Sequence, residues 1–392
     1  MKKGVLYMIT LVFSLTILLT GCTGKETKTL QENTTATNKN IQSTGEEAKT
    51  LQETATAANK DIRSKLIKYM DDYSNEKGFS GTVLIVKDDD ILLNRGYGMA
   101  DYDKKIANTP RTVFEIGSLT KQFTAAAILM LQEKKLLSVQ DSINKYIPGY
   151  PNGDKIKIYN LVTQTSGIPD FFNPNNFDSM LSRKHTYTPE EIIKMFKNKS
   201  LNFEPGTKFE YSNSNYILLG YIIEKVSNMK YEDYVQKNIL KPLKMNQTGF
   251  LSKKPKIENK AIGYSLLNIQ SNDYSRSFEA EGSLTYAAGE MYSTAEDLYK
   301  WENALFTGKV INKQSLNEML TPNLDSYGYG LDIDNSAEGD KVAYHGGDTL
   351  GFSSFMAKDI DKNCVLIILS NKQYDKSRYD ISAGVYKILA NK

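Results

Sequence analysis

The stretch that decides the fold is Thr112-Val-Phe-Glu-Ile-Gly-Ser118-Leu-Thr-Lys121-Gln-Phe-Thr-Ala-Ala-Ala-Ile-Leu-Met-Leu131. Its β-rich opening, Thr112–Ile116, predicts a short strand. A helix is expected from Ser118 to Leu137. The middle of that helix, Ala125–Leu131, is apolar on every side, which predicts that the helix is buried in the core. We therefore expect Ser118 to lie at the entrance to a buried helix.

Ser118 and Lys121 carry the chemistry of this stretch. Residues three apart share one helix face, so the Lys121 amine is expected beside the Ser118 hydroxyl. A serine hydroxyl needs a neighbouring base to act as a nucleophile, and a buried lysine gives up its proton more readily. The helix N-terminus adds positive potential where an oxyanion would form. Other Ser-x-x-Lys copies begin at Ser74, Ser142 and Ser227, but they lack this setting.

Two later motifs offer groups that could complete such a site. In Tyr211-Ser-Asn213, a phenol whose pKa is lowered by a nearby ammonium could carry a proton, and the amide could bind a substrate carbonyl. The same pattern is also typical of a turn. His345-Gly-Gly347 is the only Gly-Gly pair in the chain and follows a β-rich run, Lys341–Tyr344. Glycine on a strand permits close approach of a ligand, although a bulge would also explain it.

Taken together, the three motifs resemble the active-site set of the penicillin-recognising serine hydrolases. The Tyr-x-Asn form of the second motif resembles that of one branch of these enzymes, which comprises class C β-lactamases, DD-peptidases, D-aminopeptidases and related esterases. Further landmarks of that branch are Phe114-Glu-Ile-Gly-Ser118, Leu161-Val-Thr-Gln-Thr-Ser-Gly-Ile-Pro169, Glu204-Pro-Gly-Thr207 and Gly351-Phe352. The resemblance implies an α+β, β-lactamase/transpeptidase-like fold over residues 61–392.

The resemblance also implies a role for each motif residue. Ser118 would form an acyl-enzyme, with Lys121 and Tyr211 sharing the work of base and acid and Asn213 orienting the substrate amide. The backbone N–H groups of Ser118 and Asp348 would form the oxyanion hole. His345, Gly346 and Gly347 would form the substrate-binding strand edge, with His345 supporting proton transfer by Tyr211. No metal and no other cofactor is implied.

One departure from the family pattern bears on the substrate. Gly346 stands where β-lactamases and penicillin-binding members usually carry Thr or Ser, and His345 replaces a permanently charged Lys. Both changes weaken the clamp for a substrate carboxylate. We therefore expect a peptidase or esterase acting on D-amino-acid peptides or esters. A class C-type β-lactamase is the alternative, and a non-hydrolytic penicillin or cell-wall binding protein is an alternative of another class.

Elements on either side of the central stretch predict how the domain is assembled. Strands near both chain ends around a helical middle, roughly 138–260, predict one antiparallel sheet made from both ends, flanked by helices, with a mainly helical subdomain inserted. The expected helices are Ile62–Tyr73 and Ser377–Leu389, and the expected strands are Phe79–Val86, Ile91–Tyr97, Gly328–Asp332 and Cys364–Leu369.

The N-terminal residues have the pattern of an export signal. Lys2 and Lys3 precede an apolar run, Val5–Leu19, and Leu19-Thr-Gly-Cys22 resembles the lipobox of bacterial lipoproteins. Residues 1–21 would then be a signal peptide, with lipid attached to Cys22; an uncleaved anchor helix is the alternative. Residues 22–60 are polar and contain a duplicated segment, which predicts a disordered tether. We expect an extracytoplasmic enzyme, lipid-anchored to the membrane near peptidoglycan.

The composition excludes several other classes of protein. With 49 Lys and Arg against 46 Asp and Glu, the net charge of +3 gives no reason to expect a nucleic-acid partner. Two cysteines and two histidines in 392 residues exclude a disulfide scaffold and a His-rich metal site. The remaining chemistry must come from Ser, Tyr, Lys and carboxylates.

Overall fold

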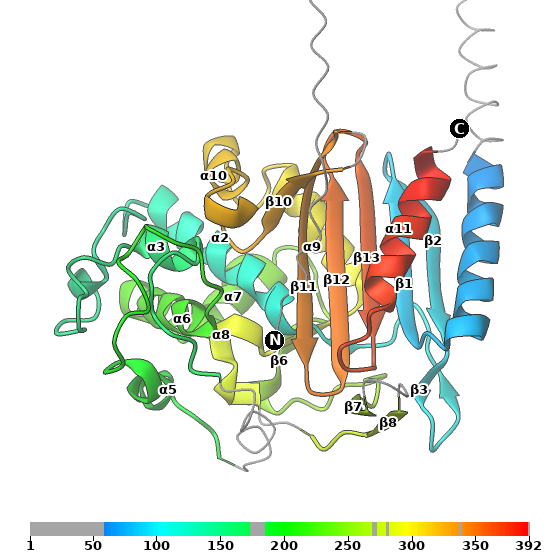
Figure 1. Cartoon of the computed structure of the whole chain (residues 1–392), viewed down its shortest axis with the longest axis horizontal. Coiled ribbons are helices and arrows are strands. Elements are labelled where there is room, and N and C mark those ends of the chain that lie inside the picture. The colour runs from blue at the N-terminus through cyan, green and yellow to red at the C-terminus, as the bar shows by residue number, and fades with distance from the viewer. Residues whose placement is uncertain (1–58, 173–184, 269–272, 280–281, 337–338, 391–392) are drawn as a thin grey trace, which may run out of the picture. The chain divides into compact units, whose positions relative to one another are not determined.

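A six-stranded antiparallel sheet with helices on both faces forms the centre of the protein (Figure 1). The computed structural model describes residues 59–172, 185–268, 273–279, 282–336 and 339–390. The strand order in the sheet is β10-β11-β12-β13-β1-β2. The strands of the protein are β1 (Gly81–Lys87), β2 (Asp90–Tyr97), β3 (Met99–Asp101), β4 (Ile106–Ala107), β5 (Phe114–Glu115), β6 (Gly249–Phe250), β7 (Tyr264–Asn268), β8 (Asp273–Arg276), β9 (Met291–Ser293), β10 (Asp332–Asn335), β11 (Lys341–Thr349), β12 (Phe352–Asp359) and β13 (Cys364–Ser370).

Helices cover the sheet and fill the region beside it. Residues 59–77 form a first helix, and the short 3-10 helix η1 covers Gly117–Leu119. The α-helices are α2 (Thr120–Glu133), α3 (Ile158–Val162), α5 (Pro189–Phe196), α6 (Asn213–Ser227), α7 (Tyr231–Val235), α8 (Tyr286–Gly289), α9 (Ala295–Phe306), α10 (Lys313–Met319) and α11 (Ser377–Ala390). No helix in these residues has the length and apolar character that crossing a membrane requires.

The sheet joins the two ends of the described chain, as the sequence predicts. Strand β1 pairs with β13 in antiparallel register, from Gly81 opposite Ser370 to Lys87 opposite Cys364. The two expected strands pair as the antiparallel hairpin β1–β2, with Asp88 and Asp89 in the left-handed conformation at its tip. The predicted α+β fold with one sheet from both chain ends is therefore confirmed.

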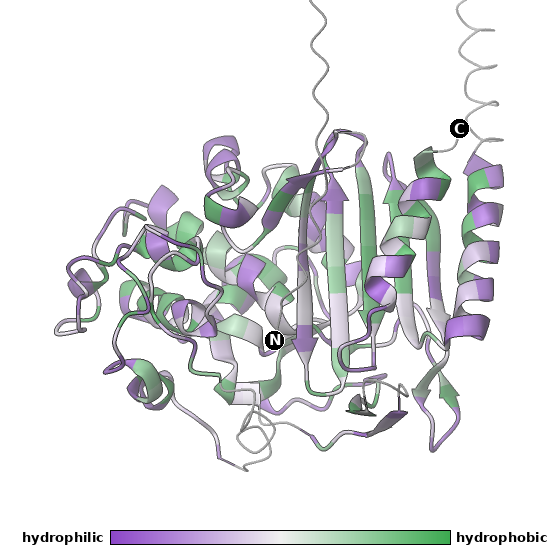
Figure 2. Ribbon diagram, viewed as in Figure 1, coloured by the Kyte–Doolittle hydropathy of each residue, from purple (hydrophilic) through white to green (hydrophobic). Residues whose placement is uncertain are grey.

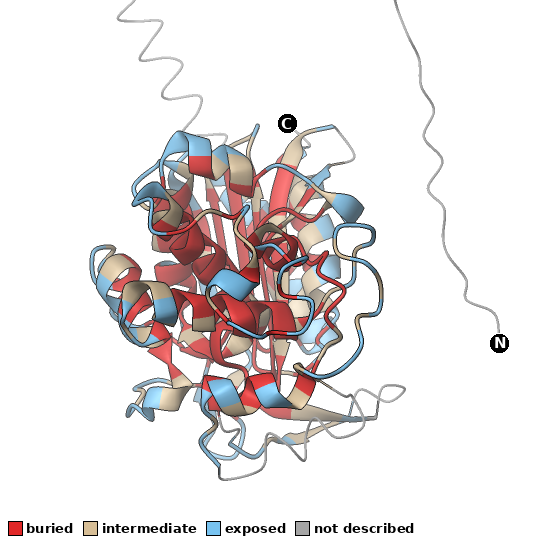
Figure 3. Ribbon diagram, turned by 90° about the vertical axis from the view of Figure 1, so that its left-hand side faces the viewer, coloured by how far each residue is buried: buried red, intermediate tan, exposed pale blue. Residues whose placement is uncertain are grey.

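Both faces of the sheet are buried. Along β13, Val365 and Ile367 pack into a core that includes α2, while Leu366 and Ile368 pack under α11 and the helix at 59–77. This alternation follows from the two-residue period of a strand. Figure 2 shows hydrophobic residues both on strands of the sheet and on the helices beside it, and Figure 3 shows buried residues in the same elements. Cys364, at the start of β13, is buried in the core under α11.

Helix α2 runs through the centre of the larger core. Nearly all of its side chains are buried, in keeping with its apolar sequence. Phe123 stacks on Trp301 of α9, with ring centroids 4.1 Å apart. Most of the regular structure between residues 138 and 260 is helical, as predicted, and α6 packs on both α2 and α8. The helical subdomain therefore packs against α2, the helix that begins next to Ser118.

Two predicted elements differ from the structure. The helix expected from Ser118 to Leu137 begins with the η1 turn and ends at Glu133, because Lys135 adopts a left-handed conformation. The strand expected at Gly328–Asp332 was wrong, since β10 begins only at Asp332. The Gly328 N–H donates to the carbonyl of Leu331 at 2.8 Å, closing a turn. Within it Gly330, with φ +73°, lies so close to the Lys121 carbonyl that a side chain would clash.

Predictions for the N-terminal region remain predictions. Residues 1–58 lie outside the described residues, and they include Cys22, the expected signal peptide and nearly all of the expected tether.

Candidate active site

Ser118 and Lys121 lie side by side where η1 passes into α2. The Lys121 side chain is fully buried, and its Nζ donates to Ser118 Oγ at 3.0 Å. It also donates to Asn213 Oδ1 and to the carbonyl oxygen of Ala288 in α8, both at 2.8 Å. These three acceptors hold the amine in one position. Once Lys121 has lost its proton, the lone pair on Nζ is therefore within reach of the Ser118 hydroxyl.

Burial changes the acidity of Lys121. It lowers the pKa of the amine from 10.5 to about 7, and the nearby Asp170 carboxylate opposes this effect only in part. Removing an ammonium from water disfavours its charged form. An amine with this pKa is partly neutral at physiological pH and can accept the proton of Ser118.

Tyr211 differs from its expected charge state. Its ring centroid lies 4.9 Å from Lys121 Nζ, so the ammonium is close, as expected. Burial nevertheless raises the pKa of the phenol above its ordinary value, and the hydrogen bond to Ser118 only reduces that shift. The expectation of a lowered phenol pKa was therefore wrong, because desolvation outweighs the charge. Tyr211 keeps its proton and is suited to donate it.

Asn213 is the first residue of α6 and connects Lys121 to a carboxylate. Its Oδ1 accepts from Lys121, and its Nδ2 donates to Asp170 Oδ2 at 2.9 Å. Sequence reasoning missed Asp170 as a site residue. The position of Asp170 directly after the Leu161–Pro169 motif could have indicated it. The contact between Asp170 and Asn213, however, depends on how that loop folds.

The two glycines after His345 allow β11 to touch the segment that carries the serine. A Cβ on Gly347 would lie 2.2 Å from the Ile116 carbonyl oxygen and 2.9 Å from the Ser118 nitrogen. A Cβ on Gly117, which has φ +51°, would lie 3.0 Å from the Asp348 carbonyl oxygen. This close approach brings the backbones of Ser118 and Asp348 to one wall, where the sequence predicts their N–H groups to bind an oxyanion.

The Asp348 side chain points to the opposite face of β11 and holds the strand end. Its Oδ2 accepts from Arg378 Nη2 of α11 at 2.8 Å, and its Oδ1 accepts from Ser353 Oγ at 2.6 Å. Gly346 faces the same way, since a Cβ there would lie 3.6 Å from Arg378 Cζ. An ion pair from the C-terminal helix thus braces the strand behind the expected oxyanion hole.

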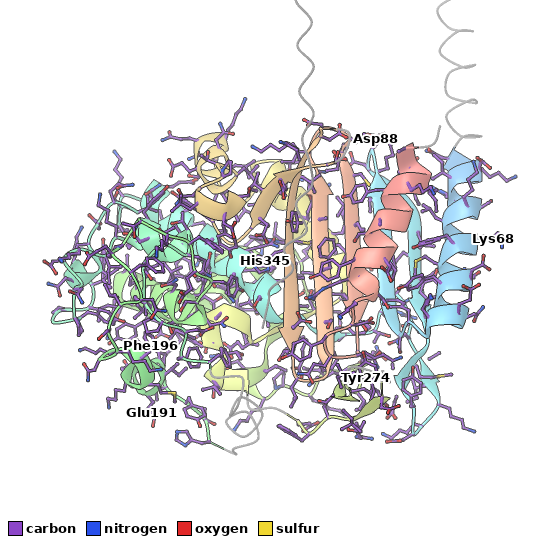
Figure 4. All side chains as sticks on the ribbon, in the orientation of Figure 1. Lys68, Asp88, Glu191, Phe196, Tyr274 and His345 are labelled. Atoms are coloured by element: carbon purple, nitrogen blue, oxygen red, sulfur yellow. The ribbon has the colours of Figure 1, made fainter. Side chains whose placement is uncertain are left out.

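His345 lies on the β11 face toward α2 (Figure 4), and its ring centroid lies 6.1 Å from that of Tyr211. Its expected support of proton transfer by Tyr211 stays a prediction. Its Nδ1 donates to the Gly346 carbonyl oxygen at 2.5 Å, which leaves Nε2 to accept from the Tyr327 hydroxyl at 3.2 Å. Burial lowers the pKa of the imidazole to about 3. His345 is therefore neutral and bonded to Tyr327, a residue that sequence reasoning missed, so it gives Tyr211 no positive charge.

A cleft of about 400 Å³ opens over the serine. Among its lining residues are Gly117, Ser118, Asp170, Phe172, Asn213, Leu266, Thr285, Ala288, Asp348, Thr349 and Gln373. In the described part of the chain, no group of three or more His, Cys, Asp or Glu side chains could hold a metal ion. The chemistry that these residues supply is that of a hydroxyl nucleophile with an amine base.

Known proteins are similar to this chain in sequence and in fold. The putative penicillin-binding protein PbpX of Bacillus subtilis (strain 168) is 34% identical over 319 residues, 81% of this chain and 77% of that protein. The solved octameric penicillin-binding protein homologue from Pyrococcus abyssi has a TM-score of 0.73 at 29% identity, covering 84% of this chain and 78% of that one. A D-stereospecific amidohydrolase from Streptomyces sp. has a TM-score of 0.68 at 28% identity, covering 79% and 93%.

The family assignment rests on the length of the match as well as on the motifs. A family model described as Beta-lactamase matches residues 65–387, from the first helix to α11. The chain therefore belongs to the β-lactamase family, with penicillin-binding proteins among its relatives.

Proposed function

We propose that this chain is a serine hydrolase that forms an acyl-enzyme on Ser118. The observation that carries the proposal is the pairing of Lys121 with Ser118. The two side chains are 3.0 Å apart, and burial lowers the pKa of the amine to about 7. A base within hydrogen-bond reach of the nucleophile, with a pKa near the working pH, is what general-base catalysis requires.

The proposed reaction proceeds in two stages. Ser118 Oγ bonds to the substrate carbonyl carbon while its proton passes to Lys121 Nζ, and the backbone N–H groups of Ser118 and Asp348 stabilise the oxyanion. The bond to the leaving group then breaks. Tyr211 protonates the leaving group and regains a proton from Lys121. Water next attacks the acyl carbon and gives one proton to Lys121 Nζ, which passes it to Ser118 Oγ as the ester bond breaks, so that the acid is released and the hydroxyl is restored.

The proposed substrates are peptides or esters of D-amino acids. The D-stereospecific amidohydrolase with a similar structure supports this substrate class. His345 supports it too, since burial keeps this residue neutral where β-lactamases usually carry a charged Lys that helps to hold a carboxylate. The penicillin-binding relatives favour a second candidate, slow or stoichiometric acylation by penicillin, which would use the same serine.

We place the enzyme outside the cytoplasm. The support is the sequence pattern at Lys2, Lys3 and Leu19–Cys22. Lipid on Cys22 would anchor it to the membrane. Residues 22–60 would tether the domain near peptidoglycan, whose peptides contain D-amino acids.

A labelling and turnover experiment tests the proposal. A fluorophosphonate probe should label the wild-type protein, and peptide mapping should place the label on Ser118. The Ser118→Ala variant should lose both labelling and hydrolysis of D-alanine p-nitroanilide, D-Ala-D-Ala peptides and nitrophenyl esters. Ser227→Ala, which alters another Ser-x-x-Lys copy, is the matched control. Full activity of Ser118→Ala would refute the mechanism, and rapid turnover of a chromogenic cephalosporin alone would refute the substrate class.

A further inference from the structure

The charges around the cleft distinguish one end of a substrate from the other. Asp170 and Asp348 are the only charged residues among the described residues that line it, and the Asp348 side chain points to the opposite face of β11. Asp348 is compensated, because Arg378 donates to its Oδ2 and Ser353 to its Oδ1. Asp170 is therefore the carboxylate whose charge the cleft leaves in excess.

From the part of the chain that the structure describes, Asp170 receives only neutral hydrogen-bond donors. Its Oδ1 accepts from the Phe172 backbone N–H at 3.1 Å and its Oδ2 from Asn213 Nδ2 at 2.9 Å. No Lys, Arg or His within the described ranges forms an ion pair with it at 4.0 Å or less. Each carboxylate oxygen has a further lone pair, so the group can accept another donor. Burial raises the pKa of the Asp170 carboxyl, and a bound cation would lower that pKa and stabilise the charged form.

The excess charge is greatest in the reactive state. Lys121 must be neutral to accept the proton of Ser118, and no other cationic side chain among the described residues lines the cleft. Asp170 is joined to the nucleophile through two side chains, since Asn213 bonds to both Asp170 and Lys121, and Lys121 bonds to Ser118. Three consecutive hydrogen bonds thus link the Asp170 carboxylate to the reacting serine.

We propose that Asp170 is the subsite for a free α-ammonium group, so that the enzyme cleaves amides and esters of unblocked amino acids. The inference deepens the proposed function and rests on it. The α-ammonium of such a substrate is two bonds from the carbonyl carbon that Ser118 attacks. A substrate with a free carboxylate near the scissile bond would meet Asp170 as a like charge, which disfavours the penicillin-like and C-terminal peptide substrates.

Binding an ammonium also prepares the base. A positive charge beside Asp170 cancels the interaction by which that carboxylate raises the pKa of Lys121. The amine then loses its proton more readily. The same substrate charge therefore improves binding and favours the neutral form of Lys121. N-acetylation of the substrate removes both effects.

Matched substrates and inhibitors test the inference on the wild-type protein. D-alanine p-nitroanilide should have a kcat/KM about 10- to 100-fold above that of its N-acetyl derivative, in line with a hydrogen bond to a charged group. D-alaninamide should inhibit nitrophenyl ester hydrolysis more strongly than D-lactamide, its neutral isostere. Equal values in both comparisons, or a preference for the N-acetyl substrate or for D-lactamide, would overturn the inference.

Variants separate this inference from the proposed function. Asp170→Asn should reduce the ratio of the two kcat/KM values to about threefold or less, and Asp170→Glu should restore part of it. Asp72→Asn, an exposed carboxylate on the first helix, should leave the ratio unchanged. If the wild-type protein shows no fluorophosphonate labelling of Ser118, the proposed function itself fails. Labelling and turnover with an unchanged ratio in Asp170→Asn refute only the ammonium subsite.

Discussion

A methyl group on Gly347 should separate the two backbones that form the expected oxyanion hole. The added Cβ would lie 2.2 Å from the Ile116 carbonyl oxygen, 2.5 Å from Ser354 Oγ and 2.9 Å from the Ser118 nitrogen. Ordinary contacts begin near 3.4 Å, so β11 and the serine segment must move apart by roughly 1 Å. A misplacement of that size costs on the order of 10²-fold in rate, and overpacking costs about 1–3 kcal/mol of stability.

The neighbouring glycine provides the control. On Gly346 a Cβ would meet Arg378 Cζ at an ordinary 3.6 Å, on the opposite face of the strand. The assay compares the rate of fluorophosphonate labelling of Ser118 and the Tm of both alanine variants. Gly347→Ala should be labelled at least about tenfold more slowly than Gly346→Ala and melt at a lower temperature. Equal labelling rates and equal Tm values would refute the reasoning.

Three further predictions concern buried titratable groups. Because the pKa of His345 is lowered to about 3, the imidazole should stay neutral between about pH 5 and pH 8. The pH profile of Ser118 labelling over this range should therefore have the same shape in the wild type and in His345→Gln. A change in rate with pH that is present in the wild type and lost in His345→Gln would mean that the imidazole becomes charged. Burial raises the pKa of Glu290 from 4.5 to about 8. Its protonated form is favoured in the fold, so wild-type stability falls as pH rises between these values. In urea unfolding, the advantage of Glu290→Gln should be larger at about pH 8 than at about pH 5, and a constant difference would contradict this. The pKa of buried Cys364 is raised to about 12, so peptide mapping should find it alkylated by iodoacetamide only after denaturation; alkylation in the native protein would show that the strand opens.

Local pattern was enough to predict the frame of the fold. The continuous apolar run of β13 and the fully apolar middle of α2 each allow one arrangement, because both faces of the sheet and every side of the helix must be covered. The order of the three motifs predicted which distant side chains meet, and Lys121 does contact Ser118 and Asn213. Apolar patterns and helix spacing depend only on residues close together in the sequence, so they can be interpreted correctly without knowing the tertiary contacts.

Charge states and loop contacts could not be predicted in the same way. The pKa of Tyr211 is raised and His345 is neutral because the completed fold excludes water from both, which no local pattern records. Asp170 and Tyr327 reach the site from loops whose paths depend on the surrounding packing. The run at Gly328–Leu331 has apolar residues with strand-like spacing, but close contact with α2 makes it a turn.

The most direct test of the central claim is the pH dependence of the rate at which Ser118 is acylated. The account predicts that the rate rises with pH through an apparent pKa of about 7, the value for Lys121, as the amine loses its proton. Lys121→Met and Lys121→Arg should both lose this rise, since neither side chain can accept a proton. Lys145→Met, at an exposed Ser-x-x-Lys copy, should keep it. A rate independent of pH, or an unchanged profile in Lys121→Met, would contradict the assignment of Lys121 as the base.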